Sequence, residues 1–332
     1  MIMALLEVKD LKVYYKTLRG CVKAVDSVSL NIEKGRALGI AGESGCGKTS
    51  MAMAILRLLP VNGKVYGGLV MLDGVDILSM DDEEFRESVR WKRISMISQG
   101  AMNALNPVHT VGEQIIEAIL THEDVTRSEA VRRGNDLLEM VGIHPGRSKD
   151  YPHEFSGGMK QRIVIAMALS CNPDIVIADE PTTALDVMVQ SQILKAIGDL
   201  RNALDLSLML ITHDLSIIAQ TCDDIAVMYG GKIIEYGSVV NVYGNPKHPY
   251  SIGLLKSFPN IKAEKAPIIS MPGSPPDLLS PPAGCKFHPR CPLAKGICLE
   301  KEPELAKVHP DNHRVACHNT DMLKKGTDIW NQ

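Results

Sequence analysis

The residues best suited to chemistry form the stretch "GESGCGKT" at positions 42 to 49. Its three glycines allow a tight turn whose backbone N–H groups point at phosphate oxygens, and the helix expected after it adds a positive dipole. Lys48 can neutralise the β- and γ-phosphates of a nucleotide, and the Thr49 hydroxyl can bind Mg²⁺. We expect the Cys46 thiol only to fill space. The predicted ATP-binding residues here are Gly42, Glu43, Ser44, Gly45, Cys46, Gly47, Lys48, Thr49 and Ser50.

A pair of acids ends a second stretch, "DIVIADE", at positions 174 to 180. Four apolar residues place Asp179 at the tip of a buried strand, where a carboxylate can hold the water shell of Mg²⁺. Glu180 follows on the side of the γ-phosphate, where it can polarise the attacking water. Together the two stretches indicate only a P-loop NTPase, with Mg²⁺ bound beside the phosphates.

The tetrapeptide "SGGM" offers another anion site. Ser156, Gly157 and Gly158 precede a helical pattern, and a helix N-terminus binds anions through its N–H groups. One chain then has two phosphate-binding stretches but a single Lys48. The sequence therefore predicts a dimer in which each Ser-Gly-Gly loop covers the γ-phosphate held by the other subunit. The alternative is a glycine-rich helix start with no ligand.

These motifs need elements to position them. "RALGIAG" reads as a buried strand before the phosphate loop, and "KTSMAMAILRLL" as a helix that ends at Pro60. Later segments alternate strand and helix, which predicts an α/β fold with a largely parallel sheet. Alternating residues from 4 to about 40 predict an antiparallel sheet, and residues from about 110 to 150 are mainly helical.

Composition narrows the class of protein. The chain has 332 residues, 45% of them hydrophobic and 23% charged, so it can bury an ordinary globular core. A net charge of -3 without basic clusters gives no reason to expect nucleic acid. No apolar run approaches the length of about eighteen residues that spans a bilayer, so any membrane role would be peripheral. The N-terminal apolar stretch closes at Glu7 without a basic start, so we expect no export.

With these motifs in this order, residues 4 to about 258 resemble the ATP-binding subunits of ABC transporters. The resemblance implies a RecA-like P-loop NTPase core with an antiparallel β subdomain and a helical subdomain at about 100–160. It also implies roles for residues that look ordinary alone. Gln99 would reach Mg²⁺ and link to the membrane subunit, and His213 would contact the γ-phosphate. Within "ALD" (Ala184 to Asp186), Asp186 would signal across the dimer.

One aromatic residue completes the predicted ATP site. Tyr15 shares the inward parity of Leu11 and Val13 in the first strand, and it looks like the family's adenine-stacking aromatic. Tyr14 is the alternative. The chain departs from the family pattern at Met159, where Gln is usual, but Ser156 and the backbone would still contact phosphate.

The oligopeptide and dipeptide importer subset is a narrower resemblance, carried by "FSGGMKQR", "MNALNP", "NPKHPYSIGLL" and the cysteine-rich tail. It implies a second, related ATP-binding subunit, two transmembrane permease subunits, an extracytoplasmic binding protein, and a peripheral position on the cytoplasmic face of the cell membrane. A homodimer is the alternative to the heterodimer. Some members of the subset look like carriers of oligosaccharides and related ones carry nickel, so the cargo stays open.

Residues 259–332 are expected to form a C-terminal extension, in which prolines separate a small cysteine-rich module from the nucleotide core. Its cysteines have intervening gaps of five, six and eighteen residues, which match no standard zinc or ferredoxin spacing. Four thiols could nevertheless hold so small a segment together as metal ligands. The family resemblance favours a [4Fe-4S] cluster; Zn²⁺, drawing on His288 or His313, and plain thiols are the alternatives. The proposed ligands are Cys285, Cys291, Cys298 and Cys317.

Two other classes of function fit the sequence less well. A soluble ABC-type ATPase of DNA repair would carry a long coiled coil before the signature, and one of translation would fuse two cassettes; the chain has neither. A redox sensor with a vestigial ATPase conflicts with the intact set of catalytic residues.

Overall fold

The computed structural model describes most of the chain, and the described residues cluster into two compact units. The first unit contains Met1–Leu5, Ile32–Ala37 and Ser79–Ile211, and the second contains Leu6–Asn31, Leu38–Leu78 and Thr212–Gln332. Ala184, the start of "MNALNP" and the boundary expected near residue 258 lie outside the described residues. The described residues are 4–100, 104–183, 185–257, 271–308, 312–323 and 329–330.

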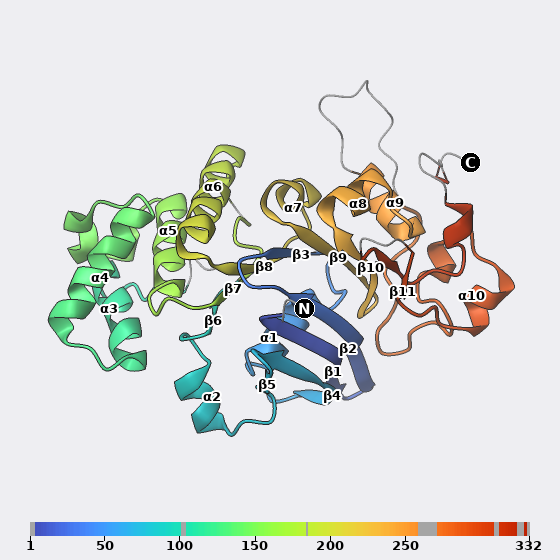
Figure 1. Cartoon of the computed structure of the whole chain (residues 1–332), viewed down its shortest axis with the longest axis horizontal. Helices are drawn as coiled ribbons and strands as arrows, with labels where there is room; N and C mark the ends of the chain where they lie inside the picture. The colour runs from blue at the N-terminus through green and yellow to red at the C-terminus, as the bar shows by residue number, and fades with distance from the viewer. Residues whose placement is uncertain are drawn as a thin grey trace. The chain divides into compact units, whose positions relative to one another are not determined.

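Three parallel strands form the centre of the first unit (Figure 1). Strand β7 (Ile175–Asp179) pairs in parallel with β6 (Ile94–Ile97) on one side and with β8 (Ser207–Ile211) on the other. Every residue of β7 and β8 is buried, as expected for parallel strands covered on both faces. The carboxyl ends of the strands meet at one edge of the sheet, where Asp179 is the last residue of β7.

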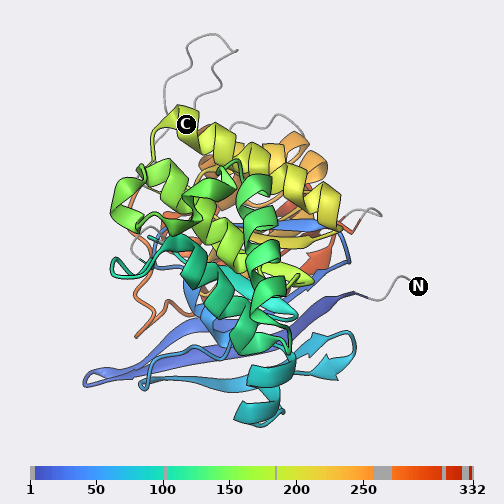
Figure 2. The same ribbon diagram turned by 90° about the vertical axis from the view of Figure 1, so that its left-hand side faces the viewer.

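Helices make up the rest of the first unit. Helix α3 (Val111–His122) starts at a capping box of Thr110 and Glu113, and α4 (Arg127–Met140) starts at Thr126. Figure 2 shows these two helices packed together. The short α2 was not expected from the sequence. The remaining helices are α2 (Asp82–Ser88), η2 (Pro145–Lys149), η3 (Pro152–Glu154), α5 (Gly157–Ala168) and α6 (Val187–Leu204).

An antiparallel sheet in the second unit matches the expected N-terminal sheet. Its strands lie in the order β2 (Gly20–Ile32), β1 (Leu6–Thr17), β4 (Gly63–Leu72) and β5 (Val75–Asp76). The register of β1 against β4 shifts between Lys9 and Val13, which marks a β-bulge. A bulge offsets the alternation of side chains along the strand.

The phosphate loop lies between β3 (Ala37–Ala41) and α1 (Lys48–Ile55). Strand β3 runs parallel to β9 (Asp224–Tyr229), which pairs antiparallel with β10 (Lys232–Ser238). Helix α1 ends before the expected Pro60, because Arg57 adopts a left-handed conformation with φ of 54° that a helix cannot continue. Three more helices follow in this unit: α7 (Leu215–Thr221), α8 (Val239–Gly244) and α9 (Pro249–Lys256).

The tail packs against the rest of the second unit, which contains the phosphate loop. This corrects the expectation that the prolines keep the tail separate from the nucleotide core. Strand β12 (Arg314–Val315) pairs with β10, and β11 (Ala306–Lys307) pairs with β12 (Figure 1). The Phe287 ring packs on Tyr229 at 5.1 Å and on Tyr250 at 5.5 Å between centroids. A segment this small has little core of its own, so it buries its apolar residues against neighbouring strands and helices. The tail also contains η4 (His288–Arg290), α10 (Gly296–Glu300) and η5 (Thr320–Met322).

A buried carboxylate joins the tail to β10 and α9. Glu235 is fully buried, and its side chain accepts hydrogen bonds from the backbone N–H groups of Lys247 (2.6 Å) and His248 (3.0 Å). The ring Nε2 of His313, from the tail, lies 2.7 Å from the same carboxylate. The tail therefore shares one buried carboxylate with β10 and with the start of α9.

His248 should make the stability of this region depend on pH. Its buried ring accepts a hydrogen bond from the Tyr250 N–H at Nδ1 (3.0 Å), and burial lowers its pKa to about 3. In the unfolded chain a His side chain has a pKa of about 6.5, so it binds a proton at a pH where the folded His248 stays neutral. Stability is therefore lost as pH falls below about 6.5. We expect His248 to lower the free energy of unfolding by about 2 kcal/mol when the pH falls from about 8 to about 5.

Urea unfolding at the two pH values measures this loss. His248→Asn keeps an acceptor for the Tyr250 N–H but does not titrate, so its free energy of unfolding should fall less on acidification than that of the wild type. His109→Asn, at an exposed position, is the matched control. An equal fall in His248→Asn and wild type would contradict the prediction.

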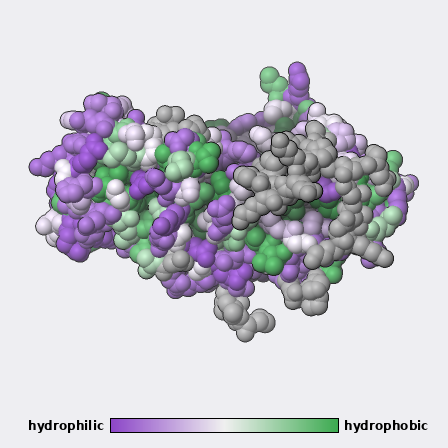
Figure 3. Space-filling model, turned by 90° about the horizontal axis from the view of Figure 1, so that it is seen from above, coloured by the Kyte–Doolittle hydropathy of each residue, from purple (hydrophilic) through white to green (hydrophobic). Residues whose placement is uncertain are grey.

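One face of the molecule is seen in the space-filling view (Figure 3). Hydrophilic residues cover much of the face seen in Figure 3, with smaller hydrophobic groups between them. In the part of the chain that the structure describes, no helix has the length and apolar character needed to cross a bilayer.

Candidate functional site

The phosphate loop has the geometry that its glycines predict. Gly42, Gly45 and Gly47 have φ of 154°, 79° and 106°, a region that other residues rarely adopt. A Cβ on Gly42 would lie 2.2 Å from the carbonyl oxygen of Met228, and one on Gly47 would lie 2.0 Å from that of Ala24. Only glycine fits at these two positions, so the loop depends on backbone rather than side chains.

Lys48 closes the loop from inside. Its side chain is 6% exposed, and Nζ donates to the carbonyl oxygens of Gly42 (2.7 Å) and Glu43 (2.9 Å). Burial raises the pKa of the Cys46 thiol more than the neighbouring Lys48 ammonium lowers it. Cys46 is therefore a buried neutral thiol, in agreement with its expected space-filling role. The ammonium is thus held by backbone carbonyls of the loop, and its contact with phosphate stays a prediction.

The two candidate tyrosines of β1 have different neighbours. The Tyr15 hydroxyl donates to Ser50 Oγ in α1 at 3.1 Å, and Gly63 on the paired strand leaves room for its ring. Tyr14 instead stacks on Tyr66 and hydrogen bonds to Asp26, and burial together with that carboxylate raises the Tyr14 pKa to about 12. Tyr15 is thus the one beside the phosphate-loop helix; its contact with adenine stays a prediction.

In the first unit, the acidic end of β7 meets Gln99. Strand β6 is parallel to β7, so Gln99, which follows β6, reaches the same edge as Asp179 and Glu180. Gln99 Nε2 donates to Glu180 Oε2 at 2.9 Å. Asp179 is 1% exposed. Mg²⁺ binds oxygen ligands, and each residue of the predicted set, Thr49, Gln99 and Asp179, carries a side-chain oxygen; their contact with the ion stays a prediction.

Glu180 is held in an unusual conformation. Its φ is 47°, its N–H donates to the Ile211 carbonyl (2.8 Å), and Thr183 Oγ1 donates to its Oε2 (2.9 Å). A left-handed backbone at a non-glycine residue costs of order 1 kcal/mol or more, so the surrounding contacts must hold Glu180 in this conformation. The sequence pattern did not point to Thr183, because a hydroxyl within "PTTA" reads as an ordinary turn residue.

The Ser-Gly-Gly loop begins α5. Ser156 occupies the N-cap position, is exposed, and makes no side-chain hydrogen bond to the helix. Gly158 has a packing reason of its own, since a Cβ there would lie 2.5 Å from Val189 in α6. The geometry therefore leaves the Ser156 hydroxyl outside the helix cap, while Gly158 allows α5 and α6 to approach closely.

Asp186 and His213 were predicted from the resemblance. Asp186 Oδ1 accepts the Val189 N–H at 3.0 Å and so caps α6. The next residues, Val187 and Met188, are 79% and 73% exposed. His213, in the second unit, is exposed just before α7.

The predicted nucleotide-site residues divide between the two units. Gln99, Ser156, Gly157, Gly158, Asp179, Glu180 and Asp186 belong to the first. Tyr15, the phosphate loop from Gly42 to Ser50 and His213 belong to the second.

Comparison with known proteins decides the family. Residues 25–183 match the family model "ABC transporter", and residues 234–298 match "Oligopeptide/dipeptide transporter, C-terminal region". The chain is 45% identical to the oligopeptide transport ATP-binding protein OppD of Escherichia coli, over 96% of this chain and 95% of that protein. It is 46% identical to the dipeptide transport ATP-binding protein DppD of Bacillus subtilis, over the same shares. The chain belongs to the oligopeptide/dipeptide family of ABC transporter ATP-binding subunits.

Solved structures agree on the fold of this ABC subunit. The dimeric bacterial cassette MJ0796 is similar with a TM-score of 0.62 and 28% identity, covering 70% of this chain and 98% of that one. A post-hydrolysis dimer of the same cassette, bound to ADP and phosphate, has a TM-score of 0.62 and 27% identity, with the same coverage. The fold is the ABC ATPase cassette, and the subunit is an ATP hydrolase.

The tail cysteines of the ABC subunit influence one another. Burial raises the pKa of Cys291 to about 12 and that of Cys317 to about 11, and nearby Cys285 and Cys298 contribute to both shifts. The Asn319 N–H donates to Cys317 Sγ at 3.3 Å. The cysteines are free thiols. Among the described residues, however, no three His, Cys, Asp or Glu side chains form a group arranged to hold a metal ion.

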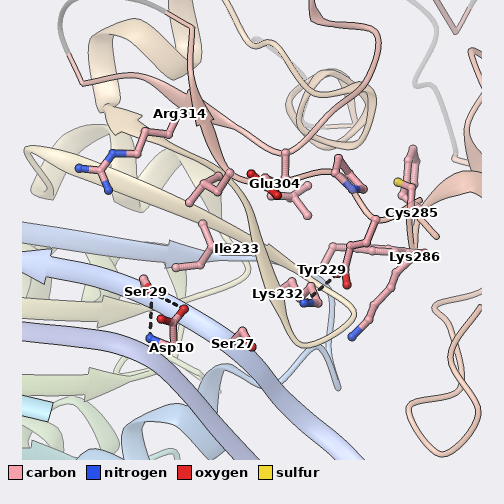
Figure 4. A pocket seen from close by; sticks show the side chains of 16 residues that line it. Asp10, Ser27, Ser29, Tyr229, Lys232, Ile233, Cys285, Lys286, Glu304 and Arg314 are labelled. Atoms are coloured by element: carbon pink, nitrogen blue, oxygen red, sulfur yellow. Dashed lines mark hydrogen bonds and ion pairs between the residues drawn. The ribbon is translucent and has the colours of Figure 1, made fainter. Parts of the chain in front are cut away.

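A cavity of about 530 Å³ opens beside the tail in the second unit (Figure 4). Asp10 and Ser29, joined by hydrogen bonds, line it from the β1–β2 sheet, and Cys285, Lys286 and Arg314 line it from the tail. None of the predicted ATP-binding residues lines it. This cavity is therefore a feature of the docked tail, not of the nucleotide site.

Proposed function

We propose that this subunit hydrolyses ATP to drive the uptake of dipeptides or oligopeptides across the cell membrane. The observation that carries the proposal is the similarity to OppD and DppD over 96% of the chain, tail included. A cassette alone is common to ABC proteins of many cargoes, whereas a match that continues through the C-terminal region favours the peptide-transporting members.

In this proposal the chain's residues divide the chemistry of hydrolysis. The phosphate-loop N–H groups and Lys48 bind the phosphates, and Tyr15 stacks on adenine. Thr49, Gln99 and Asp179 would hold Mg²⁺, which neutralises phosphate charge when bound. Glu180 accepts a proton from the attacking water and His213 contacts the γ-phosphate.

We also propose that a second ATP-binding subunit completes each site. Ser156, Gly157 and Gly158 would contact the γ-phosphate held by the partner, and Asp186 would transmit its state. The exposed Val187 and Met188, next to Asp186, support a partner surface, because adjacent large apolar side chains in water favour burial. The partner is expected to be a related but different chain. Two transmembrane permeases and an extracytoplasmic binding protein complete the importer, with this subunit peripheral on the cytoplasmic face.

Peptide uptake by the cells that naturally carry this gene tests the cargo. Cells lacking this gene should fail to grow when a required amino acid is supplied only as a tripeptide, and should fail to accumulate the labelled peptide. The wild-type gene should restore both, and a gene carrying Glu180→Gln should restore neither. Normal peptide uptake in the deleted cells, with loss of labelled oligosaccharide or nickel uptake, would replace the peptide proposal by one of the alternatives.

We propose that the chain divides into a cassette at 4–258, with its helical subdomain at about 100–160, and an extension at 259–332.

Within the extension we propose that the four cysteines bind a [4Fe-4S] cluster. The hydrogen bond from Asn319 to Cys317 supports this, since N–H donors to sulfur tune such clusters. A cluster requires all four to be thiolates that close on one site.

Metal analysis of protein purified without oxygen tests the cluster. We expect about four irons and four sulfides per chain, and a loss of both in Cys291→Ser. Cys21→Ser removes a thiol far along the chain from this module and should keep the metal. One zinc without sulfide would establish the zinc alternative, and the absence of both metals would leave plain thiols.

A further inference from the structure

An ion pair joins the tail to the phosphate loop. Arg290 Nη1 and Nη2 donate to the two carboxylate oxygens of Glu43 at 2.7 Å and 3.0 Å. The side chains are 5% and 25% exposed. Two parallel, charge-assisted hydrogen bonds out of water are among the stronger polar contacts in proteins and fix geometry as well as charge. The pair therefore constrains where Glu43 lies.

The tail holds Arg290 firmly in place for this contact. Its Nε donates to the Pro272 carbonyl at 2.8 Å, and its guanidinium lies near the rings of Tyr229 (5.8 Å) and Phe287 (5.9 Å). The hydrogen bonds to Glu43 raise the pKa of Arg290. Arg290 is thus a fixed cation whose position depends on the docking of the tail.

On the loop side, Glu43 is held at three points. Besides its carboxylate on Arg290, its N–H donates to the Tyr250 hydroxyl at 2.9 Å. Its carbonyl oxygen accepts from Lys48 Nζ at 2.9 Å. One of the two residues whose carbonyls orient the Lys48 ammonium is therefore the residue that the tail holds. Tyr250 packs on Phe287, so the same tail segment supports two of the three points.

We propose that Arg290 is a positioning residue for ATP binding: through Glu43 it keeps the phosphate loop and the Lys48 ammonium in the phosphate-binding conformation. Without Arg290 the Glu43 carboxylate would turn toward water and move the carbonyl that braces Lys48, because a partly buried charge does not stay unpaired. Binding is affected more than the chemical step, since Arg290 touches no reacting atom. The inference rests on the proposed nucleotide-binding role of the loop.

Lys286 provides a matched control. It lies four residues before Arg290 in the same tail segment, is similarly buried, and donates to Asp26 at 3.0 Å and to the Gly230 carbonyl at 2.9 Å. It therefore docks the same tail onto β2 and the β9–β10 turn without touching Glu43. Removing it weakens docking but leaves the loop contact in place.

Equilibrium titration of the full chain with a fluorescent ATP analogue makes the test. We expect Arg290→Met to raise the dissociation constant about tenfold and Arg290→Lys, which keeps one charged contact, to raise it less. Lys286→Met should change it less than about twofold, although its thermal unfolding should shift as far as that of Arg290→Met. In the assembled complex kcat should change little for Arg290→Met, while KM rises.

A second variant reaches the ion pair from the loop. Glu43→Gln leaves the tail sequence unchanged, so it tests the contact even if Arg290→Met fails to fold. The double variant Glu43→Gln with Arg290→Met should weaken binding no more than Glu43→Gln alone, because the two side chains act as one unit. Wild-type affinity in Glu43→Gln, or equal weakening by Lys286→Met, would overturn the inference. A wild-type chain that does not bind the analogue would instead overturn the proposed nucleotide site.

Discussion

Glu180→Gln should lower ATP turnover in the assembled complex by about 100-fold or more, while ATP still binds. An amide keeps the size of the side chain and can keep its hydrogen bond to Gln99 or Thr183, but it cannot accept the proton of the attacking water. Because the nucleotide is then bound and not consumed, the ATP-bridged dimer should accumulate. Phosphate release measures turnover, and gel filtration with ATP measures the dimer.

The matched control for this change is Glu139→Gln, at an exposed position of α4 in the same unit. It removes one carboxylate without altering the end of β7, so its turnover should equal that of the wild type. Near wild-type turnover in Glu180→Gln would remove Glu180 from the role of base. Loss of ATP binding in the same variant would show that Glu180 supports the fold of the site instead.

Lys48→Ala should have the second large effect, a loss of ATP affinity of about 10- to 100-fold. The ammonium pairs with phosphate in the ground state, so binding itself is weakened and not only the rate. The structure adds a second cause, because Nζ braces the carbonyls of Gly42 and Glu43. Equilibrium titration with the labelled analogue measures the change.

Lys64→Ala, on the exposed side of β4, controls for the loss of one positive charge and should bind as the wild type does. If Lys48→Ala bound the analogue with unchanged affinity, the glycine-rich loop would not be the nucleotide site.

The phosphate loop was predictable because its requirements are local. Gly42 and Gly47 need φ values that only glycine adopts readily, and a buried strand and a helix flank them in sequence. The meeting of Gln99 with the end of β7 was implied by the family resemblance, and the parallel pairing of β6 with β7 accounts for it.

The tail could not be predicted in the same way. Prolines and glycines indicate a linker, but the docking depends on Phe287 and Arg290, whose partners are remote in sequence. No periodicity or spacing connects an arginine to a glutamate in a distant loop. The choice of Tyr15 over Tyr14 rested on the parity of Leu11 and Val13, and both of these residues are buried in the structure.

The separation of the Arg290–Glu43 pair has a consequence for synthesis of the chain. The two residues are 247 positions apart, so at about 5–20 residues per second the ribosome makes Glu43 about 12 to 50 s before Arg290 exists. During that interval β3, the loop and α1 can form from residues already made, but the carboxylate has no tail to hold it. A nascent chain stopped before residue 290 therefore carries a phosphate loop without this ion pair.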